Sequence, residues 1–274
     1  MNYRHIYHAG NFADIFKHLV LHMVLGYLQE KDKGLMVLDA FAGTGLYDLT
    51  AFEPKKTKEF MSGVGPLMQR PAENVDIKTF QSFIEPDWKR QYYMGSPLIA
   101  AHMLRPQDRL IVNELHPDDN ESLQKNVVGF KNVHVTKRDA YEVIRGNIPP
   151  TERRGLILID PPFENPEEFE LLVQQMAEWK RRWPTGCYII WYPIKAGRQV
   201  DNLHNAAADL GLNRTWVSEY LLQHRDTEGS LNGCGLLVFN TPYGIPERVD
   251  TLAAELGKLI GEGWIESQFL TSSS

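Results

Sequence analysis

The stretch Asp160-Pro161-Pro162-Phe163 concentrates residue types suited to chemistry at the end of an apolar run, residues 156–159. Proline cannot donate to a strand's hydrogen-bond ladder, so the strand ends at Asp160 and a stiff loop follows. The Asp160 carboxylate and the Pro161 carbonyl can hold both hydrogens of a planar amine, while Phe163 stacks on the ring bearing it. An exocyclic amine such as adenine N6 is a poor nucleophile, and this clamp would orient its lone pair toward a methyl donor. The alternative is a strand-ending turn with a surface aspartate.

The segment LDAFAGTG, residues 38–45, places Asp39 at a strand end and Gly43 and Gly45 in the turn that follows. Glycines let the backbone approach a ligand closely, and the next helix offers free N–H groups. The third glycine of the dinucleotide fingerprint is missing. The form D-x-x-x-G-x-G is similar to the nucleoside-binding loop of S-adenosylmethionine (SAM) methyltransferases, in which Asp39 would hold the amino acid end of SAM directly or through water. A glycine turn that only links two elements is the alternative.

Acidic residues follow four successive predicted strands: Asp39, Glu114, Asp139 and Asp160. Ligands bind at the carboxyl edge of an open α/β sheet, so this joint pattern is the strongest structural argument in the chain. Glu114 can accept both ribose hydroxyls, and Asp139 can accept from the adenine amine. A surface ion pair is the alternative for Glu114.

The hydrophobic pattern predicts alternating strands and helices. Asn11 is a candidate N-cap for an amphipathic helix that precedes the first strand. Strands are expected at 35–39, 109–114, 133–135, 156–160, 187–192, 216–222 and 235–240, and further helices at about 97–104, 118–128, 166–182, 198–210 and 247–260. A hairpin between the last two strands would place an antiparallel strand at the sheet's edge. The fold class expected is α/β, a Rossmann-like seven-stranded SAM-dependent methyltransferase.

Residues 46–95 interrupt this alternation between the first two strands with prolines, lysines and polar helix-like pieces. A structureless loop of that length is improbable inside a compact domain. We therefore expect a small, mostly helical inserted subdomain at 46–95, with residues 1–45 and 96–274 forming the methyltransferase domain.

The bulk composition restricts the class of protein. The 274 residues carry a formal net charge of -6, which argues against wholesale coating of nucleic acid but not against a local basic patch. No apolar run approaches the roughly 20 residues that span a bilayer, and the N-terminus lacks the apolar stretch of a signal peptide. Cys187 and Cys234 lack metal-ligand spacing and are expected to be buried free thiols. These features predict a cytoplasmic protein.

Four motifs together resemble a known family. They are YRHIYHAGNFADIFKH near the N-terminus, GSPLIA at 95–100, NELHP at 113–117 and DPPFE at 160–164. They look like those of the large-subunit (23S) ribosomal RNA adenine-N6 methyltransferases of the RlmJ type, and the resemblance runs from residue 3 to the last predicted strand. The N-terminal motif is the specific part, because D-P-P-[FY] is shared with other amine methyltransferases.

The resemblance implies roles for individual residues. It implies that Asp160 is the catalytic acceptor, that Tyr3 reaches the RNA, and that the SAM site contains the following side chains: His18, Ser96, Glu114, Asp139, Ala140 and Asp160. Phe41 stands where the family commonly has histidine, so only a backbone contact to SAM is expected there. From the residues alone, Lys17 and His18 would be placed on a solvated helix face, and Ser96 before Pro97 would be an N-cap.

The combined prediction is a monomeric enzyme that methylates the N6 amine of an adenosine in protein-free large-subunit ribosomal RNA, using SAM and no metal. Basic clusters at 55–58, 137–138 and 153–154 would form a phosphate-binding rim if they surround the edge that carries Asp160, whereas the cluster at 180–182 is expected to be structural. The alternatives are a DNA adenine-N6 methyltransferase and a non-catalytic SAM- or RNA-binding module.

Overall fold

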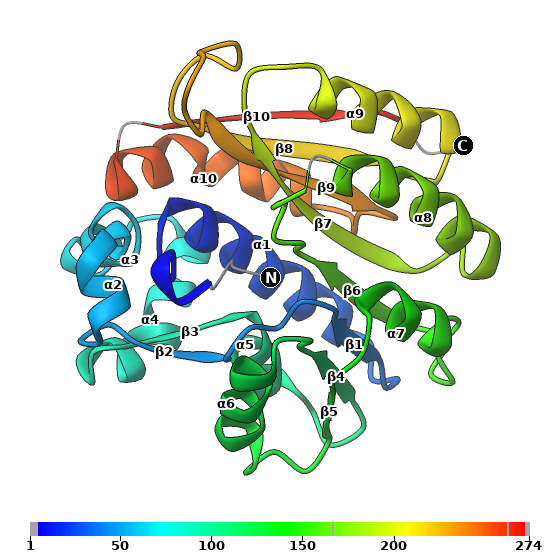
Figure 1. The fold of residues 1–274 in the computed structure, drawn as a ribbon, viewed down its shortest axis with the longest axis horizontal. Helices are drawn as coiled ribbons and strands as arrows, with labels where there is room; N and C mark the ends of the chain where they lie inside the picture. Colours follow the sequence, from blue (N-terminus) through cyan, green and yellow to red (C-terminus); the bar gives the residue numbers. More distant parts are fainter. Residues whose placement is uncertain (1–4, 166, 262, 272–274) are drawn as a thin grey trace.

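The computed structural model describes residues 5–165, 167–261 and 263–271. Within these ranges, eight strands form one sheet in the order β10-β8-β9-β7-β6-β1-β4-β5 (Figure 1). Strands β5 (Val133–Thr136), β4 (Arg109–Asn113), β1 (Met36–Asp39), β6 (Gly155–Ile159) and β7 (Cys187–Ile194) are parallel. Strands β1 and β6 are buried along their whole length, as expected for a parallel sheet covered on both faces. The predicted Rossmann-like α/β fold with a mostly parallel sheet is confirmed, although the described sheet has eight strands and not seven.

The antiparallel half of the sheet differs from the prediction in two ways. Strand β9 (Gly233–Phe239) pairs antiparallel with both β7 and β8 (Trp216–Leu221), so it lies inside the sheet and not at its edge. The edge is formed by β10 (Trp264–Phe269), an additional strand antiparallel to β8. Strand β10 was not predicted, because its side chains are mostly exposed and carry no apolar run.

Helices cover both faces of the sheet. On one face lie α1 (Phe12–Gln29), α5 (Ser96–Met103), α6 (Pro117–Val127) and α10 (Ile245–Ile260). On the other lie α7 (Ala140–Asn147), α8 (Glu168–Arg182) and α9 (Gln199–Leu210). Successive residues of β6 belong alternately to the two cores, because side chains of a strand alternate between faces. Helix α7 was not predicted, since its eight residues are too few to establish a helical period.

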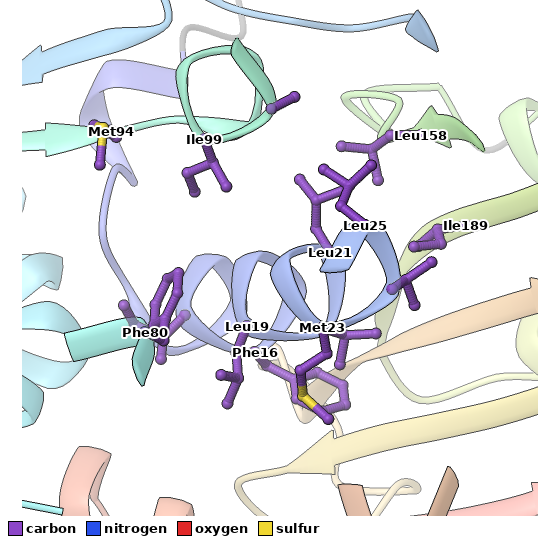
Figure 2. Close-up of a cluster of buried hydrophobic side chains, with 14 of the residues drawn as sticks. Phe16, Leu19, Leu21, Met23, Leu25, Phe80, Met94, Ile99, Leu158 and Ile189 are labelled. Carbon is purple, nitrogen blue, oxygen red and sulfur yellow. The ribbon is translucent and has the colours of Figure 1, made fainter. Parts of the chain in front are cut away.

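Helix α1 is buried almost all round. Asn11 caps it as predicted, with its side chain accepting from the backbone N–H of Asp14 at 3.0 Å. Figure 2 shows its apolar side chains surrounded by residues of α4, β3, α5, β6 and β7. A helix that is apolar on nearly every face belongs in the core of a protein, so any polar residue on it must find a buried partner.

The segment between β1 and β4 contains β2 (Leu46–Asp48), α2 (Phe52–Thr57), a 3-10 turn (Glu59–Ser62), α3 (Val64–Gln69), α4 (Val75–Lys89) and β3 (Tyr92–Met94). Strands β2 and β3 pair antiparallel and bring the two ends of the segment together. Its buried residues, such as Leu67 and Phe80, belong to the same core as α1. The assignment of 46–95 as a separate subdomain stays a prediction.

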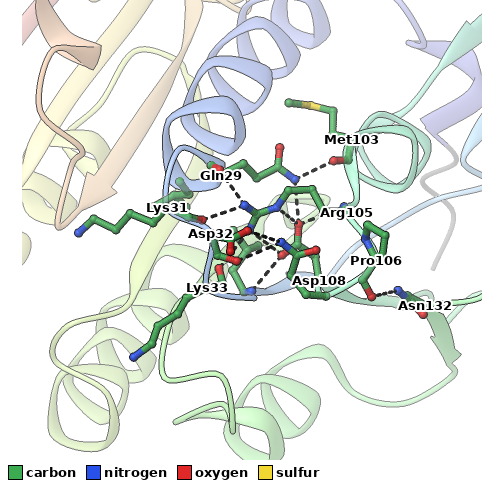
Figure 3. Close-up of polar contacts among 12 residues, drawn as sticks. Gln29, Lys31, Asp32, Lys33, Met103, Arg105, Pro106, Asp108 and Asn132 are labelled. Atoms are coloured by element: carbon green, nitrogen blue, oxygen red, sulfur yellow. Dashed lines mark hydrogen bonds and ion pairs between the residues drawn. The ribbon is translucent and has the colours of Figure 1, made fainter.

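A network of hydrogen bonds and ion pairs around Arg105 and Asp108 lies near the amino ends of the strands (Figure 3). The Arg105 guanidinium pairs with Asp108 at 2.9 Å and donates to the carbonyls of Gln29, Lys31 and Lys33 at the end of α1. These hydrogen bonds hold the C-terminal end of α1 near the amino ends of the strands, on the opposite side of the sheet from Asp160.

None of the described helices combines the length and apolar composition that a membrane crossing requires.

Candidate active site

The carboxyl ends of β1, β4, β5 and β6 meet around an open cavity with a volume of about 240 Å³. We call this the edge cavity. Most of the predicted site residues line it: His18, Phe41, Ser96, Glu114, Asp139, Ala140, Asp160 and Pro161. Phe163 does not, and Tyr3 lies outside the described residues. The structure therefore brings together side chains from distant parts of the chain at the edge where the strand pattern placed them.

Asp39 lies beneath the glycine turn with 1% of its surface exposed. Its Oδ1 accepts from the backbone N–H of Phe41 at 3.4 Å, while its Oδ2 has no hydrogen-bond partner among the described residues. Burial raises the pKa of Asp39 to about 6, although the Ser96 hydroxyl acts in the opposite direction. A buried acceptor without a partner is costly unless something supplies a donor.

Glu114 holds the glycine turn in place from the neighbouring strand. Its Oε2 accepts from the Gly43 N–H at 2.9 Å and its Oε1 from the His116 N–H at 2.7 Å. Gly43 has a φ of +60°, and a Cβ there would collide with the Tyr47 hydroxyl, so the turn requires glycine. Burial raises the pKa of Glu114 despite these hydrogen bonds. Each oxygen keeps a lone pair with which it can accept from a ligand hydroxyl.

Asp139 and Ala140 occupy the start of α7. The Oδ1 of Asp139 caps this helix by accepting from the Glu142 N–H at 2.9 Å, which leaves Oδ2 for a ligand. Ser96 is not the N-cap that the sequence suggested. Gly95 takes that position in α5, and Ser96 is the first helical residue with its side chain on the edge cavity.

Helix α1 contributes a charged cluster that the sequence analysis placed on a solvated face. The Lys17 ammonium lies 3.0 Å from Asp14 Oδ1 and contacts Asp160 Oδ2, with 4% of its side chain exposed. Burial opposes the charge of Lys17, but Asp14 and Asp160 hold its pKa well above the usual value. His5 lies 2.9 Å from the other oxygen of Asp14. The apolar composition of the surrounding helix could have indicated that Lys17 is buried, because such a helix has no solvated face for a lysine.

His18 is fully buried and acts as a neutral side chain. Burial lowers the pKa of His18 to about 3, and its Nδ1 lies 2.7 Å from the Tyr93 hydroxyl. The two rings are also stacked, with centroids 5.6 Å apart. This pairing fixes the imidazole, whose orientation the sequence alone did not constrain.

Another cavity lies on the far side of Asp160. We call this second cavity the base cavity. His5, Lys17, Asp160 and Pro162 line both it and the edge cavity. Phe163 and Trp191 form an aromatic wall of the base cavity, with ring centroids 5.9 Å apart. Phe163 has a φ of +49°, an uncommon conformation for an aromatic residue that turns its ring toward this side. The carboxylate at the end of β6 therefore stands at the junction of the cavities.

The basic clusters do not all surround this edge. Arg154 precedes β6 and donates to the carbonyls of Leu28 and Lys33, so the cluster at 153–154 lies at the amino ends of the strands. It cannot belong to a rim around Asp160. Lys180 and Arg182 donate to the carbonyls of Leu210 and Arg145, which confirms a structural use for that cluster. Cys187 and Cys234 are buried and free, as predicted.

Three comparisons relate the chain to known proteins. The family described as ribosomal RNA large subunit methyltransferase D, RlmJ, matches residues 32–267. The chain is 35% identical to the ribosomal RNA large subunit methyltransferase J of Haemophilus influenzae and 32% identical to that of Escherichia coli, each over 96% of this chain and 95% of the relative. A crystal structure of a protein from Legionella pneumophila superposes with a TM-score of 0.87 at 32% identity, covering 96% of this chain and 97% of that one. With the fold, the edge cavity and these matches in agreement, the chain belongs to the RlmJ family of ribosomal RNA large-subunit methyltransferases.

Proposed function

We propose that this protein transfers the methyl group of SAM to the exocyclic N6 amine of an adenosine in large-subunit ribosomal RNA. The names of the relatives support the ribosomal RNA substrate. We further propose that it acts in the cytoplasm as a monomer, without a metal, and that protein-free RNA is its substrate. The observation that carries the proposal is the position of Asp160 between the edge cavity and the base cavity.

The edge cavity has the chemistry that SAM requires. The ammonium of the amino acid end would supply the donor that Asp39 Oδ2 lacks. Glu114 would accept from the ribose hydroxyls, while Asp139 Oδ2 and the Ala140 N–H would meet the adenine. The carboxylates around this cavity also suit a ligand with two cationic groups. Bound there, SAM supplies an electrophilic methyl group on a positively charged sulfur.

The base cavity suits an extruded adenine. Phe163 and Trp191 offer aromatic surface for stacking, which is the usual way that an unstacked base is held. With the ring against Phe163, the amine would face Asp160 and the carbonyl of Pro161. These acceptors would orient its lone pair toward the edge cavity, and Asp160 would take the amine's proton as or after the C–N bond forms and the C–S bond breaks.

Lys17 has a defined part in this arrangement. It contacts Oδ2 of Asp160, which leaves Oδ1 to accept from the amine. The positive charge of Lys17 stabilises the negative charge of Asp160 in a partly buried setting. Lys17 thereby positions the carboxylate at the junction of the cavities, with Asp14 as its second support.

The test is transfer of a labelled methyl group from SAM to protein-free large-subunit ribosomal RNA, with duplex DNA and assembled subunits in parallel, followed by nucleoside digestion. We expect N6-methyladenosine in the RNA alone. Label in DNA alone would support the DNA methyltransferase alternative. The variant Asp160→Asn should lower kcat by about 10²–10⁴-fold while binding SAM and RNA nearly as the wild type does. Asp250→Asn, an exposed aspartate on α10, is the matched control. Full activity in Asp160→Asn would contradict the mechanism, whereas RNA binding without any methyl transfer by the wild type would favour the non-catalytic module.

A further inference from the structure

Two buried polar atoms of residues that line the edge cavity have no role in the mechanism above. The Tyr141 hydroxyl and Glu168 Oε2 are shielded from solvent and have no hydrogen-bond partner among the described residues. Both residues line the edge cavity, Tyr141 from α7 beside Ala140 and Glu168 from the first turn of α8. Buried polar atoms of native proteins are nearly always bonded, so this pair indicates a ligand that the cavity is built to receive.

Both side chains are held in place by their surroundings. The Tyr141 ring packs edge-on against Phe41, with centroids 6.0 Å apart, and stacks on Trp179 at 6.4 Å. Burial and the nearby Glu168 carboxylate raise the pKa of Tyr141, so its hydroxyl remains a donor. Burial also raises the pKa of Glu168, while the Phe163 N–H favours the ionised form. A hydrogen-bond donor and an acceptor that interact electrostatically with each other thus line the edge cavity.

This arrangement matches the edge of adenine that Asp139 and Ala140 leave uncovered. Those residues account for one N6 hydrogen and for N1, so the second N6 hydrogen and the N7 acceptor remain. We propose that Glu168 accepts the second N6 hydrogen of the SAM adenine and that Tyr141 donates to its N7, so that this pair sets the specificity of the cofactor site. The inference rests on the proposed use of SAM, but it does not depend on which nucleic acid is methylated.

The pair also connects the cavities. The backbone N–H of Phe163, a residue that lines the base cavity, lies near enough to Glu168 to lower the pKa of its carboxyl. An adenine bound in the edge cavity would therefore hold Glu168 in place, and Glu168 would in turn restrict the loop that contains Phe163. Binding of cofactor and of RNA should be coupled through Glu168.

The experiment is calorimetric binding of three probes: S-adenosylhomocysteine, its 7-deaza analogue, which lacks the N7 acceptor, and S-inosylhomocysteine, in which an oxygen replaces the amine. Tyr141→Phe should weaken the binding of S-adenosylhomocysteine by about 3- to 10-fold, the value of one hydrogen bond. It should leave the affinity for the 7-deaza analogue unchanged. Glu168→Gln should narrow the preference for S-adenosylhomocysteine over S-inosylhomocysteine by a similar factor, because an amide can turn its NH₂ toward the oxygen.

The controls are Tyr188→Phe, a buried tyrosine whose hydroxyl donates to the Trp183 carbonyl away from the cavity, and Glu170→Gln, an exposed acid in the same turn of α8. Neither control variant should alter the relative affinities for the three probes. Equal weakening of both probes in Tyr141→Phe, or an unchanged preference in Glu168→Gln, would overturn the inference while leaving methyl transfer intact. Failure of the wild type to bind S-adenosylhomocysteine at all would overturn the proposed cofactor as well.

Discussion

The Lys17 ammonium contacts the Asp160 carboxylate across 143 residues of sequence, joining the middle of α1 to the end of β6. Because the same ammonium is 3.0 Å from Asp14, one cation contacts both the N-terminal helix and the loop that begins at Asp160. The N-terminal helix therefore lies in direct contact with the loop that begins at Asp160. Lys17 thus connects the N-terminal helix directly to the residue that ends β6.

Replacement of Lys17 should destabilise the protein strongly. Lys17→Met leaves Asp14 buried without its lysine partner, and loss of one partner of a buried ion pair costs about 3–5 kcal/mol of unfolding free energy. Urea denaturation at pH 7 measures the loss. The control is Lys125→Met, which removes an exposed pair with Glu121 and should cost about 0–1 kcal/mol. A loss below about 1 kcal/mol in Lys17→Met would show that Asp14 is adequately held without Lys17.

The pH dependence of that loss has a defined sign. Burial opposes the charge of Asp14, yet His5 and Lys17 hold its pKa well below the usual value. A carboxylate with a lowered folded-state pKa stabilises the protein above its unfolded pKa, and this contribution disappears as the pH falls through the folded pKa. The stability difference between wild type and Lys17→Met should therefore shrink in acid. A difference that stays constant from pH 7 to pH 3 would contradict this account.

Binding of SAM should release a proton in mildly acidic solution. Asp39 has a pKa of about 6, so it is largely protonated at pH 5, and an arriving ammonium favours its ionised form. We expect affinity for SAM to rise about tenfold from pH 5 to pH 7, with proton release near one at pH 5 and near zero at pH 7. Calorimetry in buffers of different ionisation enthalpy measures both quantities. Asp39→Asn should abolish the linkage, and an unaltered linkage in that variant would assign the proton to another group.

The unfolding free energy of the unliganded protein should also depend on pH through the titration of Asp39. Its folded-state pKa is raised from 3.8 to about 6, so the folded protein binds more protons than the unfolded chain between these values. The contribution of Asp39 to stability is present at lower pH and is lost as the pH rises toward 6. In Asp39→Asn this part of the pH profile should be flat, which urea titrations between pH 4 and pH 7 can show.

The sequence allowed the carboxyl edge to be predicted because alternating strands and helices leave little freedom there. Parallel strands bring their carboxyl ends together, so Glu114, Asp139 and Asp160 had to lie near one another once the strands were found. Phe163 could not be assigned to a cavity, because its place depends on a positive φ that no local pattern specifies. Its role as a substrate contact stays a prediction.

Other parts of the structure depend on tertiary context. Lys17 was assigned to a solvated face because a mid-helix lysine usually is solvated, whereas burial of α1 on every side follows only from the packing of the surrounding elements. Strand β10 has few buried side chains and is determined by its pairing with β8, so its sequence carries little signal. The unpartnered atoms of Tyr141 and Glu168 can be recognised only after folding brings α7 and α8 together.

Loss of the aromatic ring at Phe163 should impair the RNA reaction without affecting the cofactor. The ring lines the base cavity and not the edge cavity, and stacking of a base on an aromatic side chain is worth about 1–3 kcal/mol. Phe163→Ala should therefore lower kcat/KM for RNA by about 5- to 150-fold and leave the Kd for SAM unchanged, whereas Phe163→Tyr should keep most of the activity. Phe269→Ala, on the partly exposed edge strand, is the control. If affinity for SAM fell as far as kcat/KM, the ring would serve to shape the methyl donor's site instead of holding the base.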